Sequence, residues 1–242
     1  MADTVSKLIF SCFVLSAPAP APGPAAVNYC ENSFCPAGVK NIGCDPPPIT
    51  GGSGCTDFKI IDLGQAEQAM IVDYFNGRRN FYASGARSPT FPQAQRMLKL
   101  TWDAELAQQA NYKSRTCSSV TDDCRNTAKY SNVGQFTNEL GLGEDTTEAY
   151  LQMLLFTASI INYTKTQAPS DWSNILNDKA VAVGCALSVY TDEGVSWKLF
   201  VCNFSDGGIV GSNVYVAGPT ASLCTTGTDQ FFSNLCSSAE VL

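Results

Sequence analysis

The sequence predicts an α+β fold in which several helices pack against a short antiparallel sheet. Two changes of pattern support this class. Apolar residues recur every three or four positions after about Gln65, as in amphipathic helices, and they alternate with other residues after Ala180, as in strands. Hydrophobic residues make up 45% of the 242 residues, so the chain can form a core. This length suits one large domain or two small ones.

Residues 1–26 are expected to be a secretory signal peptide with a proline-rich leader. Lys7 precedes a short apolar core, Leu8–Leu15, and small residues and prolines follow, so cleavage is expected between Ala17 and Ala26. The alternative is a buried N-terminal strand with a proline-rich linker. No later stretch approaches the roughly 18 consecutive apolar residues that a membrane-spanning helix needs, so we expect no transmembrane segment.

Cysteine usage also indicates a secreted, extracellular protein. Removing the leader removes one of 11 cysteines and leaves ten, an even number that predicts five disulfides in an oxidising compartment. The chain has no Cys-x-x-Cys pair, which argues against a zinc site or a dithiol redox centre. Two candidate N-glycosylation sites begin at Asn162 and Asn203.

The chain contains no histidine, and this excludes several enzyme classes. Neither a Ser-His-Asp nor a Cys-His nucleophile is available, so any catalysis would need carboxylates, lysine, tyrosine or a cofactor. The net charge is −7 and there is no run of basic residues. Nucleic acids and anionic membrane surfaces are therefore not expected as partners.

The first half of the chain predicts a loop-rich segment followed by two helices. Residues 27–62 contain four cysteines separated by prolines and glycines, and such a segment must be held by disulfides. A helix is predicted from about Gln65 to Gly85. Its expected apolar stripe is Ala66, Met70, Tyr74, Gly77 and Phe81. A second helix is predicted within Trp102–Ala110, and the side chains expected to face inward are Leu106, Ala107 and Ala110.

The second half predicts a third helix and a hairpin. The helix is expected from about Thr146 to Tyr163, with Asp145 as its N-cap. Residues 180–190 and 196–202 then alternate around a turn at 191–194, which predicts an antiparallel hairpin. Cys185 and Cys202 lie at comparable distances from this turn, so a cross-strand disulfide is geometrically reasonable. The cysteine-bounded tail is expected to form a small loop that closes on itself.

Several motifs in order resemble the CAP superfamily, which includes cysteine-rich secretory, antigen 5 and PR-1 proteins. Within it the chain is most similar to the insect antigen 5-related, salivary or venom allergen-like proteins. The motifs are Asn28–Cys30 with Cys35–Pro36 and Gly43–Cys44, then Ile71–Arg79, Leu100–Ala107, Cys124–Tyr130, Val133–Gln135, Val183–Cys185, Val201–Phe204 and the tail from Cys224 to Ser237. The resemblance implies a three-layer α-β-α sandwich with a small antiparallel sheet. The expected domains are the leader (1–26), the cysteine-rich extension (27–62), the CAP domain (63–215) and a C-terminal disulfide loop (216–242).

The resemblance also implies how the cysteines pair, which the spacing alone does not fix. The implied pairs are Cys30–Cys44, Cys35–Cys124, Cys55–Cys117, Cys185–Cys202 and Cys224–Cys236. The second and third pairs would tie the extension to the helical body. Each such bridge typically stabilises a fold by about 2–4 kcal/mol.

Many CAP domains have a cleft with two histidines and two acidic residues that can hold zinc, and this chain departs from that pattern. The corresponding positions are Thr121, Gln135, Ser159 and Asp171. The first-helix motif has Phe75 where relatives have a histidine. One carboxylate, one amide and two hydroxyls are poor ligands for a transition metal. We therefore expect neither a metal nor any other cofactor.

The expected function is non-enzymatic binding of a small hydrophobic ligand, such as a lipid, fatty acid or eicosanoid, because several kinds of CAP protein carry lipids. The candidate pocket residues between helices are Met70, Tyr74, Phe75, Met153, Leu154 and Phe156. The alternative for each of them is an ordinary core position. We expect the protein to be a monomer.

Two other functions remain as alternatives. The protein can be an interaction module that binds a host protein or receptor in haemostasis or immunity, through the exposed loops Glu31–Phe34 and Pro46–Gly54. The other reading of these loops is that they are spacers. A hydrolase is the least favoured alternative, because the adjacent acids Asp122 and Asp123 are expected to be solvated on a loop.

Overall fold

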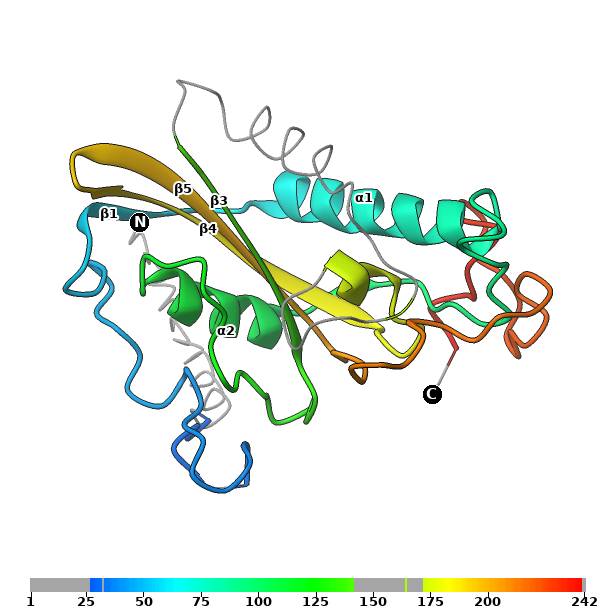
Figure 1. The fold of residues 1–242 in the computed structure, drawn as a ribbon, viewed down its shortest axis with the longest axis horizontal. Coiled ribbons are helices and arrows are strands. Elements are labelled where there is room, and N and C mark those ends of the chain that lie inside the picture. The colour runs from blue at the N-terminus through cyan, green and yellow to red at the C-terminus, as the bar shows by residue number, and fades with distance from the viewer. Residues whose placement is uncertain (1–26, 32, 142–163, 165–171, 241–242) are drawn as a thin grey trace, which may run out of the picture.

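The fold is known from a computed structural model, which describes residues 27–31, 33–141, 164 and 172–240. Helix α1 (Gln65–Ala83) and helix α2 (Ala104–Ser114) lie on opposite sides of a twisted sheet (Figure 1). The expected third helix and the signal peptide lie outside the described residues. No helix in the described part of the chain is long and apolar enough to cross a bilayer.

The sheet is built around the predicted hairpin. Strands β4 (Ala182–Asp192) and β5 (Val195–Phe204) pair antiparallel, and β1 (Thr56–Ile61) and β3 (Gly134–Gly141) flank them in the order β1-β4-β5-β3. A two-residue strand, β2 (Thr101–Trp102), adds a short parallel pairing to β4. The pleat therefore gives β4 and β5 two faces, each available to a different helix layer.

The tight turn of the hairpin explains its register. Asp192 pairs with Val195, which leaves only Glu193 and Gly194 in the loop. Both residues have positive φ, 48° and 78°, as a two-residue turn of the type I′ class requires. The same register places Cys185 opposite Cys202, and these two residues form a disulfide.

Each face of the sheet packs against its own helix. The main core joins Ile71 and Phe75 of α1 to one set of alternating strand residues, which includes Leu187 and Phe200. A second cluster joins Ala110 of α2 to the opposite set, which includes Val201. The result is a three-layer α-β-α arrangement, as the resemblance to the CAP superfamily implied.

The buried face of α1 differs from the predicted stripe. Phe81 is 42% exposed and Ala66 is exposed, whereas Phe75 and Arg79 are fully buried. The helix is thus rotated by about one position from the face expected from Ala66, Met70, Tyr74, Gly77 and Phe81. The sequence pattern hides the buried face because that face includes Arg79, a charged residue that hydropathy assigns to the surface.

Arg79 is buried because backbone carbonyl groups take up its hydrogen-bond donors. Its guanidinium donates to the carbonyl oxygens of Leu98, Ile175, Asn177 and Ala180 over 2.6–3.2 Å. Burial lowers the pKa of Arg79 to about 9, and the neighbouring Asp178 acts in the opposite direction. The Arg79 side chain thereby connects α1 to the segment before β2 and to the segment before β4.

Helix α2 begins later than predicted, because Trp102 belongs to β2. Asp103 is the N-cap, and its Oδ1 accepts hydrogen bonds from the backbone N–H groups of Glu105 and Leu106 over 2.9 and 3.0 Å. Leu106 and Ala110 are buried, as expected, and Ala107 is half-buried. A Cβ atom at Gly184 would overlap the backbone of Ala107, so this glycine allows α2 to lie close to β4.

Five disulfides join cysteines in the described part of the chain, and four of them hold segments that have little regular structure of their own. The five are Cys30–Cys44, Cys35–Cys124, Cys55–Cys117, Cys185–Cys202 and Cys224–Cys236, the same pairs that the resemblance implies. The extension also docks on α2, where the Tyr29 hydroxyl donates to Glu105 over 2.8 Å. The C-terminal loop closes on itself through its own disulfide.

Candidate functional site

Two of the four positions that the resemblance assigns to a CAP metal cleft are described by the structure. Gln135 lies on β3 and is fully buried, and Thr121 lies on the loop before it and is half-buried. Ser159 and Asp171 lie outside the described residues. The geometry of the site is therefore built from Gln135 and its neighbours.

The Gln135 side chain is occupied by contacts within the protein. Its Nε2 donates to Asp122 Oδ2 over 2.8 Å and to Asn203 Oδ1 over 3.0 Å. Its Oε1 accepts a hydrogen bond from the backbone N–H of Asp122 over 3.3 Å. Asn203 in turn donates to the carbonyl oxygen of Leu106 on α2 over 3.1 Å. This network connects β3, β5 and α2 through neutral amides.

Asp122 is part of the same network, contrary to the expectation that it is solvated. Arg125 Nε lies 2.6 Å from Asp122 Oδ1, and both side chains are mostly buried. Arg125 also donates to the carbonyl oxygen of Val133 over 3.0 Å. Only Asp123 is exposed. The hydrogen bond between Asp122 and Gln135 could not be foreseen from the sequence, because these residues are 13 positions apart and meet only when the loop folds back on β3.

A lysine that sequence analysis did not single out lies in the same region. Lys113 of α2 is almost fully buried, and its Nζ donates to Thr116 Oγ1 and to the carbonyl oxygen of Ser118, both over 2.7 Å. Burial lowers the pKa of Lys113 to about 8, and the charges of Asp122 and Glu139 oppose that shift. The five charged or amide side chains here form the cleft cluster, namely Lys113, Asp122, Arg125, Gln135 and Glu139.

The described part of the cleft does not fit a zinc ion. Zinc favours imidazole, thiolate and carboxylate ligands, and the described cleft positions supply a hydroxyl and an amide. The Gln135 amide already donates to two neighbours. The nearest carboxylate, that of Asp122, is paired with Arg125. A cation placed here would have to displace this ion pair.

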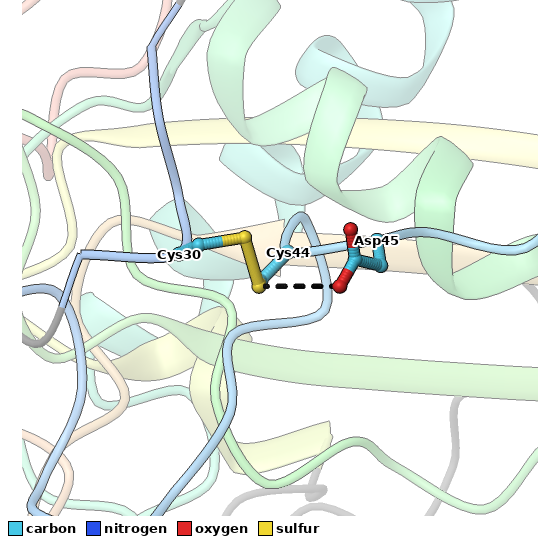
Figure 2. A group of neighbouring side chains, drawn as sticks. All are labelled: Cys30, Cys44 and Asp45. Carbon is cyan, nitrogen blue, oxygen red and sulfur yellow. Dashed lines mark hydrogen bonds between the residues drawn. A yellow bond between two sulfur atoms is a disulfide. The ribbon is translucent and has the colours of Figure 1, made fainter.

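Figure 2 shows the one group of potential ligands that the described residues bring together elsewhere: Cys30, Cys44 and Asp45. The two sulfur atoms are bonded to each other as a disulfide, so neither is a thiolate. Asp45 Oδ2 lies 3.9 Å from Cys44 Sγ and 3.2 Å from Lys40 Nζ, and its side chain is exposed. This group is an oxidised bridge beside a surface ion pair.

The expected hydrophobic pocket is described only on its α1 side. Phe75 is fully buried in the main core, where its ring centroid lies 5.4 Å from that of Phe204. Met70 and Tyr74 are half-buried at the edge of this core. The Tyr74 hydroxyl is buried and has no hydrogen-bond partner among the described residues. Met153, Leu154 and Phe156 lie outside those residues.

The two glycosylation candidates have different outcomes. Asn203 is fully buried. Its amide oxygen accepts a hydrogen bond from Gln135, and its amide nitrogen donates to the carbonyl oxygen of Leu106. A glycan on Asn203 is incompatible with this fold, so the prediction for that residue is wrong. Asn162 lies outside the described residues.

The loop Pro46–Gly54 is held firmly against α2. Arg115 donates to the carbonyl oxygen of Pro47 over 3.3 Å, and the N–H of Gly52 donates to the carbonyl oxygen of Arg115 over 2.8 Å. The Cys55–Cys117 disulfide lies next to these contacts. Ile49, near the middle of the loop, is 73% exposed.

Solved structures support the fold. The chain is similar to NaASP2, solved with Zn²⁺, at a TM-score of 0.57 and 15% identity, over 76% of this chain and 100% of that one. It is also similar to Na-ASP-1, at a TM-score of 0.57 and 16% identity, over 74% of this chain and 51% of that one. At these identities the likeness concerns the fold alone.

Sequence comparisons define the family. Venom allergen-1 of Aedes albopictus is 30% identical over 234 residues, which cover 90% of each chain. Tabinhibitin 3 of Tabanus yao is 28% identical and covers 89% of each chain. Residues 72–204 match the model of the cysteine-rich secretory protein (CAP) family. This match spans more than half of the 242 residues, and the chain therefore belongs to the CAP family of cysteine-rich secretory proteins.

Proposed function

We propose that this protein is a secreted, non-enzymatic carrier of a small hydrophobic ligand, such as a lipid, fatty acid or eicosanoid. The observation that carries the proposal is the Tyr74 hydroxyl, which is buried without a hydrogen-bond partner among the described residues. Buried hydroxyl groups in proteins nearly always have a partner, and the carboxylate or hydroxyl of an amphiphilic ligand can supply one. The half-buried Met70 beside Tyr74 offers apolar surface for the rest of the ligand.

In this proposal, Met153, Leu154 and Phe156 complete the apolar lining and Phe75 forms its floor from within the core. The Tyr74 hydroxyl is protonated at neutral pH, since burial raises its pKa further above the ordinary value of 10, and it can donate to a carboxylate. A fatty acid fits both features, because it has an apolar chain and one anionic acceptor.

The absence of catalysis is part of the same proposal. The Asp122 carboxylate is bound by Arg125 and Gln135, so it is not available as a general base for water. The Lys113 ammonium donates to two oxygen atoms of the loop that follows α2. Both arrangements support a structural role for the charged groups of the cleft cluster.

The test is titration of the delipidated full chain with a fluorescent fatty acid. Tyr74→Phe should weaken binding by up to about tenfold, since a hydrogen bond contributes about 0.5–1.5 kcal/mol. Met70→Asp should weaken it further by placing a charge in the apolar lining. Tyr112→Phe, which removes a hydroxyl from α2, is the matched control. Absence of uptake by the wild-type chain, or equal binding by Met70→Asp, would overturn the proposal.

A second candidate is recognition of a host protein through the loop Pro46–Gly54. It is favoured by Ile49, which is 73% exposed on a loop that Arg115 and a disulfide hold in place. A rigid loop loses little entropy when it binds a partner. The names of the relatives, venom allergen-1 and tabinhibitin, support an action on another organism.

This candidate is tested in platelet and leukocyte assays with Ile49→Ser. Val120→Ser is the matched control, because Val120 is 74% exposed on a different loop. A loss of potency in Ile49→Ser alone would support recognition through this loop. Equal potency of both variants and the wild type would remove the loop as the site.

A further inference from the structure

A pocket of about 240 Å³ lies between the 3-10 helix η1 (Trp172–Leu176) and the chain that follows β5. Neither Thr121 nor Gln135 lines it, and it is separate from Met70 and Tyr74. It is smaller than the roughly 300–1,000 Å³ of pockets for drug-sized ligands, so it suits a small molecule. Its described lining combines carboxylates with aliphatic side chains.

Asp206 lines the pocket, and hydrogen bonds hold its carboxylate in one orientation. Its Oδ1 accepts hydrogen bonds from Asn177 Nδ2 and from the N–H of Gly208, both over 2.7 Å, and its Oδ2 accepts from Asn132 Nδ2 over 3.3 Å. All three donors are neutral, so they orient the carboxylate without neutralising its charge.

Asp178 provides the second carboxylate. Its Oδ2 accepts from the N–H of Val216 over 3.0 Å, and no described group donates to its Oδ1. Burial raises the pKa of Asp178 and the nearby charge of Asp206 adds to this shift, whereas the Val216 N–H, Arg79 and Lys179 oppose it. A cation in the pocket would compensate for the solvation that the Asp178 carboxylate has lost.

Aliphatic side chains are exposed beside these carboxylates. Ile209 is 65% exposed and Val216 is 58% exposed, and both line the pocket. Val216 also borders a neighbouring hollow of about 410 Å³, where Leu223 is 52% exposed. Exposed apolar side chains grouped around a concave surface are typical of binding sites.

We propose that this pocket binds a small organic cation, an amine that carries an apolar or aromatic group. The ammonium lies against Asp178 and Asp206, and the apolar group covers Ile209 and Val216. Lys179 is exposed at the pocket and borders the neighbouring hollow; it is the one cation among the described lining residues, and it weakens this binding. The pocket is a second site, independent of the hydrophobic-ligand site proposed at α1.

Calorimetric titration of the full chain with three isosteric probes tests the charge of the ligand. Phenethylamine should bind, whereas the neutral 2-phenylethanol and the anionic phenylacetate should bind at least about tenfold more weakly, as expected when a charged hydrogen bond is lost. Phenylacetate binding as tightly as phenethylamine would overturn the proposal. So would the absence of phenethylamine binding at millimolar concentration.

Two variants that change the charge of the pocket give a second test, because their effects on binding should be opposite in direction. Asp178→Asn should weaken phenethylamine binding about tenfold, and Lys179→Gln should strengthen it about twofold. Asp192→Asn removes an equal charge on the distant hairpin and should change nothing. An anion-binding pocket would give the opposite signs for the first two variants, and that result would contradict the proposal.

A further pair of variants covers the case in which Asp178→Asn fails to fold because Asp178 faces Arg79. Val216→Ser changes an exposed side chain and should weaken binding several-fold through lost apolar contact. Val195→Ser, at a residue 48% exposed on the hairpin, is its control. Unchanged binding in both Val216→Ser and Lys179→Gln would overturn the assignment to this pocket.

Discussion

Gln135 Nε2 lies 2.8 Å from Asp122 Oδ2 and donates a hydrogen bond to it. This contact joins β3 to the preceding loop at a position that, by the resemblance, corresponds to an acidic metal ligand of many CAP domains. The neutral amide is what makes the contact favourable, because a second carboxylate at this point would repel Asp122.

Replacing the amide by an acid should therefore destabilise the fold. In Gln135→Glu, two donated hydrogen bonds are lost and two buried carboxylates face each other, so the free energy of unfolding should fall by about 1–3 kcal/mol near neutral pH. The loss should shrink at acid pH, when one carboxyl group is protonated. Urea unfolding measures it. Gln108→Glu, on the exposed side of α2, is the control, and equal stability of both variants would contradict this account.

Zinc binding is a separate prediction. Because the described cleft positions present an amide and a hydroxyl instead of metal ligands, titration of the full chain with zinc chloride should give no stoichiometric heat. A one-to-one site that Asp122→Asn weakens would show that the cleft cluster rearranges to bind metal, and would contradict the structural role assigned to Asp122.

Arg79 should matter for stability more than its charge suggests. Arg79→Lys keeps the charge but cannot reach four carbonyl groups, and buried acceptors left unsatisfied cost about 1–3 kcal/mol each. We expect a loss of at least about 3 kcal/mol in chemical denaturation. Arg87→Lys, at an exposed position, should be neutral. If Arg79→Lys unfolded at the same denaturant concentration as the wild type, these contacts would contribute little to stability.

The C-terminal loop should be sensitive to acid through Glu240. Hydrogen bonds from the backbone N–H groups of Thr225 and Thr226 lower the pKa of Glu240 from 4.5 to about 2. A carboxyl whose pKa is lower in the folded state stabilises the fold above its ordinary pKa, and this contribution is lost as the pH falls towards about 2.

Glu240→Gln should therefore be less stable than the wild type at pH 7, and the two should converge in acid. Urea unfolding as a function of pH measures the difference. Glu31→Gln, which removes an exposed carboxylate from the extension, should leave the profile unchanged. A constant gap between Glu240→Gln and the wild type from neutral pH to about 2 would contradict the pKa assignment.

Local patterns were sufficient to predict the hairpin. The alternation around Cys185 and Cys202 sets the register, because a shift of one residue would reverse the buried face of each strand. The face of α1 could not be found in the same way. Arg79 is buried through carbonyl groups from distant segments, and hydropathy contains no information on those partners.

The contacts within the cleft could not be predicted from the sequence either. The sequence identified Gln135 as a departure from the metal-binding pattern, but it gave no indication that Asp122 and Lys113 are buried beside it. Asn203 matches a glycosylation motif, yet its amide serves the network between β5 and α2. Such roles depend on which segments meet, and a single sequence does not encode that in any short-range pattern.

The proposed hydrophobic ligand lies beside Met70 and Tyr74, and its presence can be tested on the purified protein. Mass spectrometry of solvent extracts from protein purified without refolding tests it most directly, after the chain has been exposed to a mixture of fatty acids, sterols and eicosanoids. We expect a near-stoichiometric ligand that is retained by the wild type and by Ile49→Ser and lost from Met70→Asp. A wild-type chain that carries no ligand and takes none up would contradict the proposal.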